Sequence, residues 1–184
     1  SERIKYLWRN CNVRFDSNMN IGLYIGRFQP FHKGHLMVVK NALKSVKSLI
    51  IVPAIPMKYG ENDPFSADER AAIIKNALSK EGIKNFEVVP IRDIPSDAEY
   101  VNHVRAHTKP FNIVFVGENR LNGMLFSDAG FKVITSPRFL DISSTEVRRR
   151  MREGAIWEEL VPEGTVEQIK KKDLVKKVQK HMKK

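Results

Sequence analysis

Short apolar runs alternate with amphipathic stretches from residue 20 to residue 150, and few folds can accommodate this order of elements. The runs are nearly continuous in apolar residues, which is typical of parallel strands covered by helices on both faces. Apolar residues at helical spacing lie between them. The predicted strands are Ile21–Ile25, Leu49–Ala54, Phe86–Ile91, Ile113–Val116 and Lys132–Thr135. The predicted helices are His35–Val46, Ser66–Ser79, Tyr100–Thr108 and Leu121–Ala129.

This order predicts an α/β fold with a Rossmann-like, doubly wound parallel sheet of about five strands and a C-terminal helical extension. A capping sequence marks the start of two helices. The tetrapeptides beginning at Ser66 and Ser143 fit the Ser/Thr-x-x-Glu capping box, so both predict the first turn of a helix. Loops at 58–64, 95–99 and 137–141 leave strand ends, where open α/β sheets bind ligands.

The length of 184 residues, 42% of them hydrophobic, predicts one main domain over residues 19–164. Residues 1–18 form an extension without a clear pattern, open to interpretation as a disordered segment or as an addition from cloning. Their single cysteine, Cys11, cannot close an internal disulfide. No apolar run approaches the roughly 20 residues of a membrane-spanning helix, and no secretory signal is recognisable. We therefore expect a soluble, cytoplasmic protein without a membrane partner.

The net charge of +11 is concentrated in residues 165–184, where eight lysines outnumber two acidic residues. Leu174, Val175, Val178 and Met182 recur there at helical spacing, which predicts a basic amphipathic helix. A solvated basic face and a surface for nucleic acid or an acidic partner are both compatible with this pattern. Because the rest of the chain is nearly balanced, we do not expect nucleic acid to be a partner.

The first strand runs into the sequence GRFQPFHKGH, from Gly26 to His35, and a helix is predicted to begin near His35. A helix N-terminus offers unpaired N–H groups to an anion, and glycines let the backbone approach a ligand. His32 and His35 lie three residues apart and can both donate to a phosphate in the transition state. Arg27 adds a permanent charge. One alternative is that the histidines are loop or cap residues without a catalytic role. Another is a zinc site, although no further zinc ligand has suitable spacing.

A second segment, ISSTEVRRR from Ile142 to Arg150, combines hydroxyl side chains, a helix start and Arg148 one turn into that helix. This combination suits the outer phosphates of a triphosphate, and it equally suits a well-capped helix with a basic exposed face. P-loop and Gly-x-Gly-x-x-Gly patterns are both absent, which argues against a P-loop kinase and a typical dinucleotide-binding dehydrogenase.

Together the two segments resemble the paired signatures of the HxGH nucleotidyltransferase superfamily, and the longer first segment is most similar to archaeal-type nicotinamide-mononucleotide adenylyltransferases. Further matches follow in order over residues 20–163: DPFSADER at 63–70, Asp93-Ile94, VGEN at 116–119 and LFSDAGF at 125–131. The resemblance implies transfer of AMP from ATP to nicotinamide mononucleotide, giving NAD and pyrophosphate. The acceptor phosphate would attack the α-phosphorus in line, without a covalent enzyme intermediate, with Mg²⁺ on the triphosphate and a homo-oligomeric enzyme.

The same resemblance assigns roles to individual positions. The residues assigned to catalysis are His32, His35 and Arg148. Those assigned to ATP are Gly26, Arg27, Phe28, Gly34, Gly117, Asn119, Ser143, Ser144 and Thr145. Those assigned to the acceptor are Asp93 and Tyr100. No protein ligand for a metal is assigned.

The acceptor residues depart from the family pattern. Residues 53–58, PAIPMK, stand where the family has a Gly-Ser-Ala-Gln-like loop, and Asp97 and Tyr100 stand for its Asn and Trp. Tyr100 can stack on a pyridinium ring or be a partly buried helix residue. Asp97 offers an acceptor in place of an amide donor. Nicotinate mononucleotide, phosphopantetheine and a non-catalytic nucleotide-binding module therefore remain as alternatives.

Overall fold

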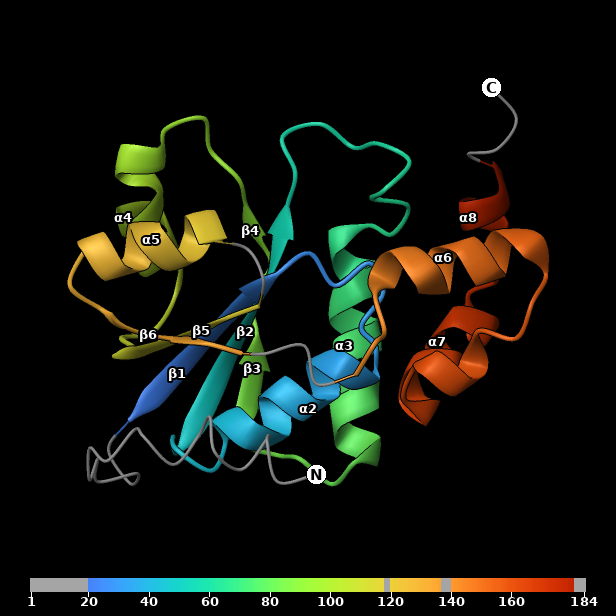
Figure 1. Ribbon diagram of the computed structural model, residues 1–184, viewed down its shortest axis with the longest axis horizontal. Coiled ribbons are helices and arrows are strands. Elements are labelled where there is room, and N and C mark those ends of the chain that lie inside the picture. Colours follow the sequence, from blue (N-terminus) through green and yellow to red (C-terminus); the bar gives the residue numbers. More distant parts are fainter. Residues whose placement is uncertain (1–19, 118–119, 137–139, 181–184) are drawn as a thin grey trace.

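The computed structural model describes residues 20–117, 120–136 and 140–180 (Figure 1). Residues 1–18, including Cys11, and Met182 lie outside these ranges, so the predictions made for them are not tested by the structure. The strands are β1 (Ile21–Gly26), β2 (Ser48–Ile55), β3 (Phe86–Val88), β4 (Ile91–Arg92), β5 (Ile113–Val116) and β6 (Lys132–Thr135). The helices are α2 (Lys33–Ala42), α3 (Ala67–Lys80), α4 (Asp97–His107), α5 (Arg120–Asp128), α6 (Ser144–Glu153), the 3₁₀ turn η1 (Glu158–Leu160), α7 (Glu163–Lys171) and α8 (Val175–Lys180).

The sheet is parallel throughout, with the strand order β3-β2-β1-β5-β6 and with β4 also paired to β2. This arrangement confirms the predicted Rossmann-like fold. The chain builds outward from β1 in one direction as far as β4 and then crosses to the other side to form β5 and β6. The carboxyl ends of β1 and β5 are therefore the point where the winding reverses, at which open α/β sheets bind ligands.

The predicted third strand, 86–91, is divided into β3 and β4, which pair with successive parts of β2. Pro90 lies in the gap and has no N–H for the ladder, which accounts for the interruption. The third predicted helix, α4, begins earlier than residue 100, because the Ser96 side chain accepts from the N–H of Glu99 and caps the first turn.

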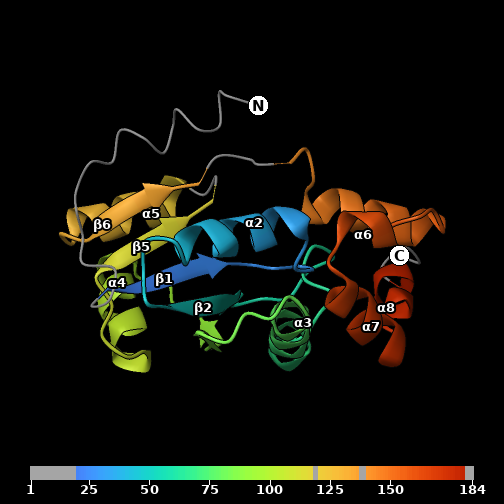
Figure 2. The ribbon, with the colours of Figure 1, turned by 90° about the horizontal axis from the view of Figure 1, so that it is seen from below.

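The central strands β1, β2 and β5 send their side chains into two separate cores. Tyr24, Leu49 and Phe115 face the core formed with α2, α3 and the C-terminal helices. Their neighbours Leu23 and Ile50 face the core formed with α4 and α5. Helices on both faces explain why the strands are apolar without alternation. Figure 2 shows α6, α7 and α8 gathered at one end of the molecule beside α3.

The C-terminal extension is two helices where the pattern predicted one. The chain turns at Asp173, whose φ is 51°, and thereby separates α7 from α8. Leu174 and Val178 are buried in the core, as their spacing predicted. The predicted boundary at residue 164 falls inside α7, which packs directly on α3. Within the described ranges, no helix is both long enough and apolar enough to cross a membrane.

The contact between α7 and α3 generates a test of packing. A Cβ atom added at Gly164 would lie 2.5 Å from the Asn76 carbonyl oxygen and 2.7 Å from Ala77 Cα. Alanine is the better helix former, but this clash forces the helices apart, so Gly164→Ala should destabilise by about 1–3 kcal/mol in urea unfolding. Gly60→Ala, where nothing lies within 4 Å, should be nearly neutral. Equal stability of the two variants would contradict the packing.

Candidate active site

Two histidines cap the first turn of α2. His32 is the N-cap residue, and its Nδ1 accepts from the backbone N–H of His35 at 3.4 Å. In return, Nδ1 of His35 accepts from the N–H of His32 at 3.2 Å. The helix thus begins at Lys33, two residues before the predicted start, because the first histidine of the motif is itself the cap. A capping box normally uses Ser or Thr with Glu or Gln, and here two imidazoles fill both positions.

This capping fixes the protonation of both rings. A backbone N–H can only donate, so each Nδ1 must be unprotonated, and in the neutral ring the hydrogen lies on Nε2. The rings stack with centroids 3.6 Å apart. Burial, together with the neighbouring His32, holds the pKa of His35 well below its ordinary value of 6.5. A neutral His35 imidazole, stacked on the ring of His32, therefore stands at the helix N-terminus.

Aromatic residues and glycines hold these rings in place. Phe31 stacks on His35 with centroids 5.5 Å apart, and Phe28 meets it edge-on at 4.9 Å. A Cβ atom at Gly34 would lie 2.9 Å from the His32 ring, so any side chain there would displace the imidazole. Phe28 has a φ of 49°, an unusual value for a bulky residue, and its buried ring fills the space beside Gly26.

Three consecutive carbonyl groups before the histidines each accept a hydrogen bond from a C-terminal helix. The carbonyl of Gln29 accepts from Arg148 Nη1 at 2.8 Å, and that of Pro30 accepts from Ser144 Oγ at 3.1 Å. The carbonyl of Phe31 accepts from Thr165 Oγ1 at 3.2 Å. We call these three bonds the carbonyl clamp. The clamp brings the two predicted motifs together, although more than a hundred residues separate them in the chain.

Arg148 is almost fully buried and held by the protein itself. Its Nη2 donates to Asn62 Oδ1 at 2.8 Å and to Thr145 Oγ1 at 3.4 Å, while Nε has no partner in the described structure. Ser143 caps α6, as predicted, by accepting from the N–H of Glu146 at 3.1 Å. Only this one of the two hydrogen bonds of the predicted capping box is formed, because the Glu146 carboxylate pairs with arginines of its own helix.

Arg27 lies between two carboxylates at the end of β1. Its guanidinium nitrogens lie 3.0 Å from Asp63 Oδ1 and 3.6 Å from Asp93 Oδ2. Beneath it, the fully buried Arg70 donates from Nη1 to the carbonyls of Arg27 and Ala54 at 2.7 and 2.8 Å. Arg70 therefore joins the carboxyl ends of β1 and β2, and this fixes the backbone from which Arg27 projects.

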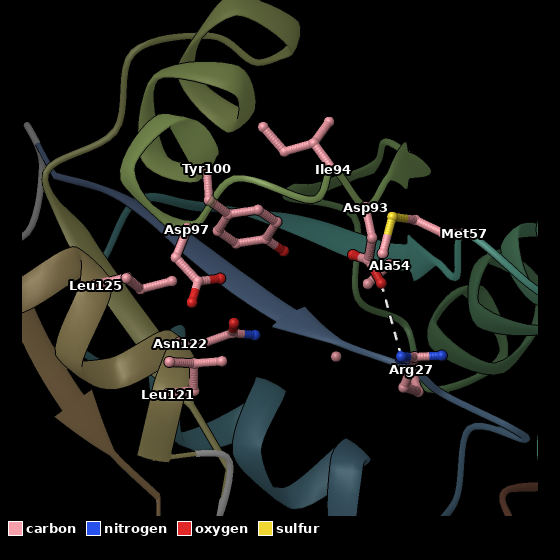
Figure 3. A pocket seen from close by; sticks show the side chains of 11 residues that line it. Arg27, Ala54, Met57, Asp93, Ile94, Asp97, Tyr100, Leu121, Asn122 and Leu125 are labelled. Atoms are coloured by element: carbon pink, nitrogen blue, oxygen red, sulfur yellow. Dashed lines mark ion pairs between the residues drawn. The ribbon is translucent and has the colours of Figure 1, made fainter.

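A pocket of about 220 Å³ opens where the winding of the sheet reverses (Figure 3). Both residues predicted to bind the acceptor, Asp93 and Tyr100, line it together with Gly26 and Arg27. Ala54 and Met57, from the unusual loop at 53–58, also reach it. The remaining lining residues are Ile94, Asp97, Leu121, Asn122 and Leu125. Burial of the Tyr100 hydroxyl raises its pKa above the ordinary value, so this group remains protonated near neutrality.

Of Gly117 and Asn119, both assigned to ATP, the structure describes only the first. Gly117 follows β5 directly, and nothing lies within 4 Å of the position of a Cβ atom there. Asn119 lies outside the described residues. In the part of the chain that the structure describes, no three His, Cys, Asp or Glu side chains form a group suited to a metal ion.

Several supporting residues received no role from the sequence. Gln29 exchanges two 3.0 Å hydrogen bonds with the backbone of Phe65, and Asn62 accepts from Arg148. The matched segment at 63–70 pointed to this neighbourhood, and Arg70 within it could have been suspected. No sequence pattern indicates the role of Thr165, because its place in the carbonyl clamp depends entirely on how α7 packs.

Comparisons with known proteins identify the family to which this chain is similar. The cytidylyltransferase-like family model matches residues 23–150. Nicotinamide-nucleotide adenylyltransferase of Pyrococcus furiosus is 37% identical over 158 residues, 83% of this chain and 84% of the relative. That of Methanosarcina mazei is 41% identical over 163 residues, 87% of this chain and 93% of the relative.

A solved structure has the same fold at lower sequence identity. It is the bifunctional NMN adenylyltransferase/ADP ribose pyrophosphatase of Francisella tularensis, complexed with AMP and a manganese ion. It aligns over 88% of this chain with a TM-score of 0.70 and 24% identity. The chain spans about half of that protein, 52% of its length.

The carbonyl clamp predicts a stability cost for removing one hydroxyl group. Thr165→Val keeps the shape of the side chain but leaves the buried carbonyl of Phe31 without its donor. The free energy of unfolding should fall by about 1–3 kcal/mol in urea titration. Thr165→Ser retains the donor and should lose less. The clamp is contradicted if the valine variant is as stable as the serine variant.

The histidine capping box predicts a pH dependence of stability. Because the folded-state pKa of His35 lies below 6.5, the unfolded chain binds more protons as the pH falls through that value. The free energy of unfolding should therefore be highest above pH 6.5 and decrease below it. His35→Gln has no titrating ring, and its amide oxygen can still accept from the N–H of His32. Urea unfolding across this pH range should show a smaller decrease for the variant, and an equal decrease would contradict the assignment.

Proposed function

The chain belongs to the cytidylyltransferase-like family and, within it, to the nicotinamide-nucleotide adenylyltransferases, and we propose that it transfers AMP from ATP to nicotinamide mononucleotide. The products are NAD and pyrophosphate. The observation that carries the proposal is the stacked pair His32 and His35 at the N-terminus of α2. The acceptor is supported by the relatives and by the pocket at the carboxyl end of β1, which Gly26 and Arg27 line.

The histidines would act as neutral hydrogen-bond donors. With each Nδ1 engaged by a backbone N–H, the hydrogen on Nε2 is the one that a neutral ring offers to a phosphate oxygen. Negative charge grows on the phosphate oxygens during transfer, and donors fixed in advance stabilise it without reorganisation. The positive end of the α2 dipole adds to the same effect.

The reaction proceeds in this proposal by direct attack of the acceptor phosphate on the α-phosphorus, with pyrophosphate leaving on the opposite side. Positioning supplies much of the rate, because the two substrates are held in line. Arg27 contributes a charge that can turn from its carboxylate partners to a phosphate. Ser143, Ser144, Thr145 and Arg148 would contact the outer phosphates, with backbone N–H groups of the α6 first turn as donors.

We assign the 220 Å³ pocket to the acceptor nucleotide. Tyr100 offers an aromatic face to the pyridinium ring, and Asp93 offers a carboxylate beside Arg27. Gly26, Phe28, Gly34, Gly117 and Asn119 complete the expected ATP site by allowing close backbone approach or by lining it.

Magnesium is proposed to enter with ATP, bound by phosphate oxygens, where it would neutralise charge on the leaving pyrophosphate. The carboxylates nearest to the reaction, Asp63 and Asp93, are turned to Arg27. The family resemblance further predicts a cytoplasmic homo-oligomer that acts on small molecules and has no nucleic-acid partner.

The direct test is to incubate the purified chain with magnesium-ATP and one acceptor at a time, measuring pyrophosphate release and identifying the product by mass. Nicotinamide mononucleotide should give NAD with the highest kcat/KM. Nicotinate mononucleotide and phosphopantetheine serve as comparison acceptors. ATP binding without turnover on any acceptor would overturn the proposal in favour of a nucleotide-binding module.

The histidine roles are tested in the same assay. His35→Ala should lower kcat about a hundredfold or more, because a donor at the developing charge is lost. His35→Gln retains a group that can cap α2. If kcat falls in both variants while the thermal stability of the glutamine variant is unchanged, the loss of kcat is due to the missing imidazole. His107→Ala, on the exposed end of α4, is the control and should retain normal turnover. Near-normal turnover of His35→Ala would remove this residue from the site.

A further inference from the structure

The connection between β2 and α3 contains an exposed segment, residues 57–63, which we call the strap. In Figure 1 this connection leaves the end of β2 and extends toward α6 before α3 begins. The strap residues from Met57 to Asn62 are exposed. Among the described residues, the strap forms a single backbone–backbone hydrogen bond, from the N–H of Asp63 to the carbonyl of Gly60 at 2.9 Å. Few backbone contacts therefore hold the strap in its position.

Two neighbouring residues of the strap contact the two arginines assigned to the triphosphate. Asp63 Oδ1 lies 3.0 Å from Nη1 of Arg27, which follows β1. Asn62 Oδ1 accepts from Nη2 of Arg148, on α6, at 2.8 Å. One short segment thus engages both guanidinium groups before any nucleotide enters.

The strap also supplies negative charge to the buried arginine. Burial and the charge of Arg152 lower the pKa of Arg148, whereas the charges of Asp63 and Glu61 act in the opposite direction. A buried guanidinium without partners is costly, so these contacts stabilise the free chain. The phosphates of ATP carry more negative charge and can accept paired hydrogen bonds from a guanidinium. They would therefore compete with the strap for the same groups.

We propose that the strap is an autoinhibitory contact, in which Asn62 and Asp63 occupy Arg148 and Arg27 until the triphosphate of ATP displaces them. The inference rests on the proposed function and adds to it a step that controls the affinity for ATP. The observed dissociation constant is the intrinsic one divided by the fraction of molecules in which the strap is displaced. The strap contacts therefore weaken ATP binding, although they stabilise the free chain.

Fixed points on both sides confine this displacement to the strap. Pro64 and Phe65 are buried, and Gln29 exchanges two 3.0 Å hydrogen bonds with the backbone of Phe65. Ser66 then begins α3 with a complete capping box. On the other side, Ile55 belongs to the ladder between β2 and β4. The strap can thus turn away from the arginines without disturbing the sheet or α3.

The first test measures nucleotide affinity without turnover. Binding of α,β-methylene-ATP with Mg²⁺ to the full chain is followed by calorimetry in the absence of an acceptor. Asn62→Ala removes the partner of Arg148 without altering the charge of the chain, so the dissociation constant should fall about threefold or more. A residue that held Arg148 in place for the phosphates would instead give weaker binding when removed. Weaker or unchanged binding by Asn62→Ala would overturn the proposal.

The ion pair is tested with a matched control in the same titration. Asp63→Asn breaks the pair with Arg27, and the dissociation constant should fall about fivefold. Asp68→Asn removes the same charge from an exposed position in the first turn of α3 and should change the constant by less than about twofold, because exposed charges are screened. Equal gains in the two variants would reflect a general attraction of anions and would contradict the strap.

Thermal unfolding separates the free form from the bound form. Asn62→Ala should lower the Tm of the free chain. At saturating α,β-methylene-ATP its Tm should match that of the unaltered chain, since the strap contact is already absent there. A Tm that is lowered equally in both forms would show a purely structural role and overturn the proposal.

The outcomes also distinguish the strap from the proposed function. If the unaltered chain does not bind the ATP analogue, the proposed function fails and the strap fails with it. If the unaltered chain forms NAD while both strap variants bind the analogue with an unchanged dissociation constant, the strap alone fails.

Discussion

The carbonyl clamp over Gln29, Pro30 and Phe31 is the interaction on which the rest of the site depends. Buried carbonyl groups need hydrogen-bond partners, and these three lie in an irregular loop that no strand or helix can satisfy. Side chains of α6 and α7 provide the donors. The loop that leads into His32 is therefore completed only when the C-terminal helices have packed against it, and the Gln29 amide fastens the same loop to Phe65.

The paired histidines serve the fold and the proposed chemistry with different ring atoms. Nδ1 of each ring satisfies a backbone N–H at the start of α2, and this contact sets the tautomer and the orientation of the ring. Nε2 is left to carry the hydrogen. The spacing His-x-Gly-His follows from this geometry, because the two members of a reciprocal capping box lie three positions apart and Gly34 leaves room for the His32 ring.

The charged side chains around the pocket are held in position by a buried charged residue. Arg70 holds the carbonyls at the ends of β1 and β2 and thereby positions Arg27. Asp63 and Asp93 then compensate the charge of Arg27. The first turn of α4 brings Asp97 to the far end of the same pocket. The balance of charge is thus a property of four segments that meet at the strand ends.

The sequence by itself determined the order of strands and helices, because continuous apolar runs and capping residues act over a few neighbours. It also determined the two motifs and named Asp93 and Tyr100 as candidate residues for the acceptor, and the structure places both in the lining of one pocket with Arg27. It missed the cap that His32 forms before Lys33, the division of the third strand at Pro90, the break at Asp173 and the partners Asn62 and Thr165. Only the tertiary structure decided these, since hydrogen bonds between distant segments and the packing of α7 on α3 depend on contacts that no local pattern records.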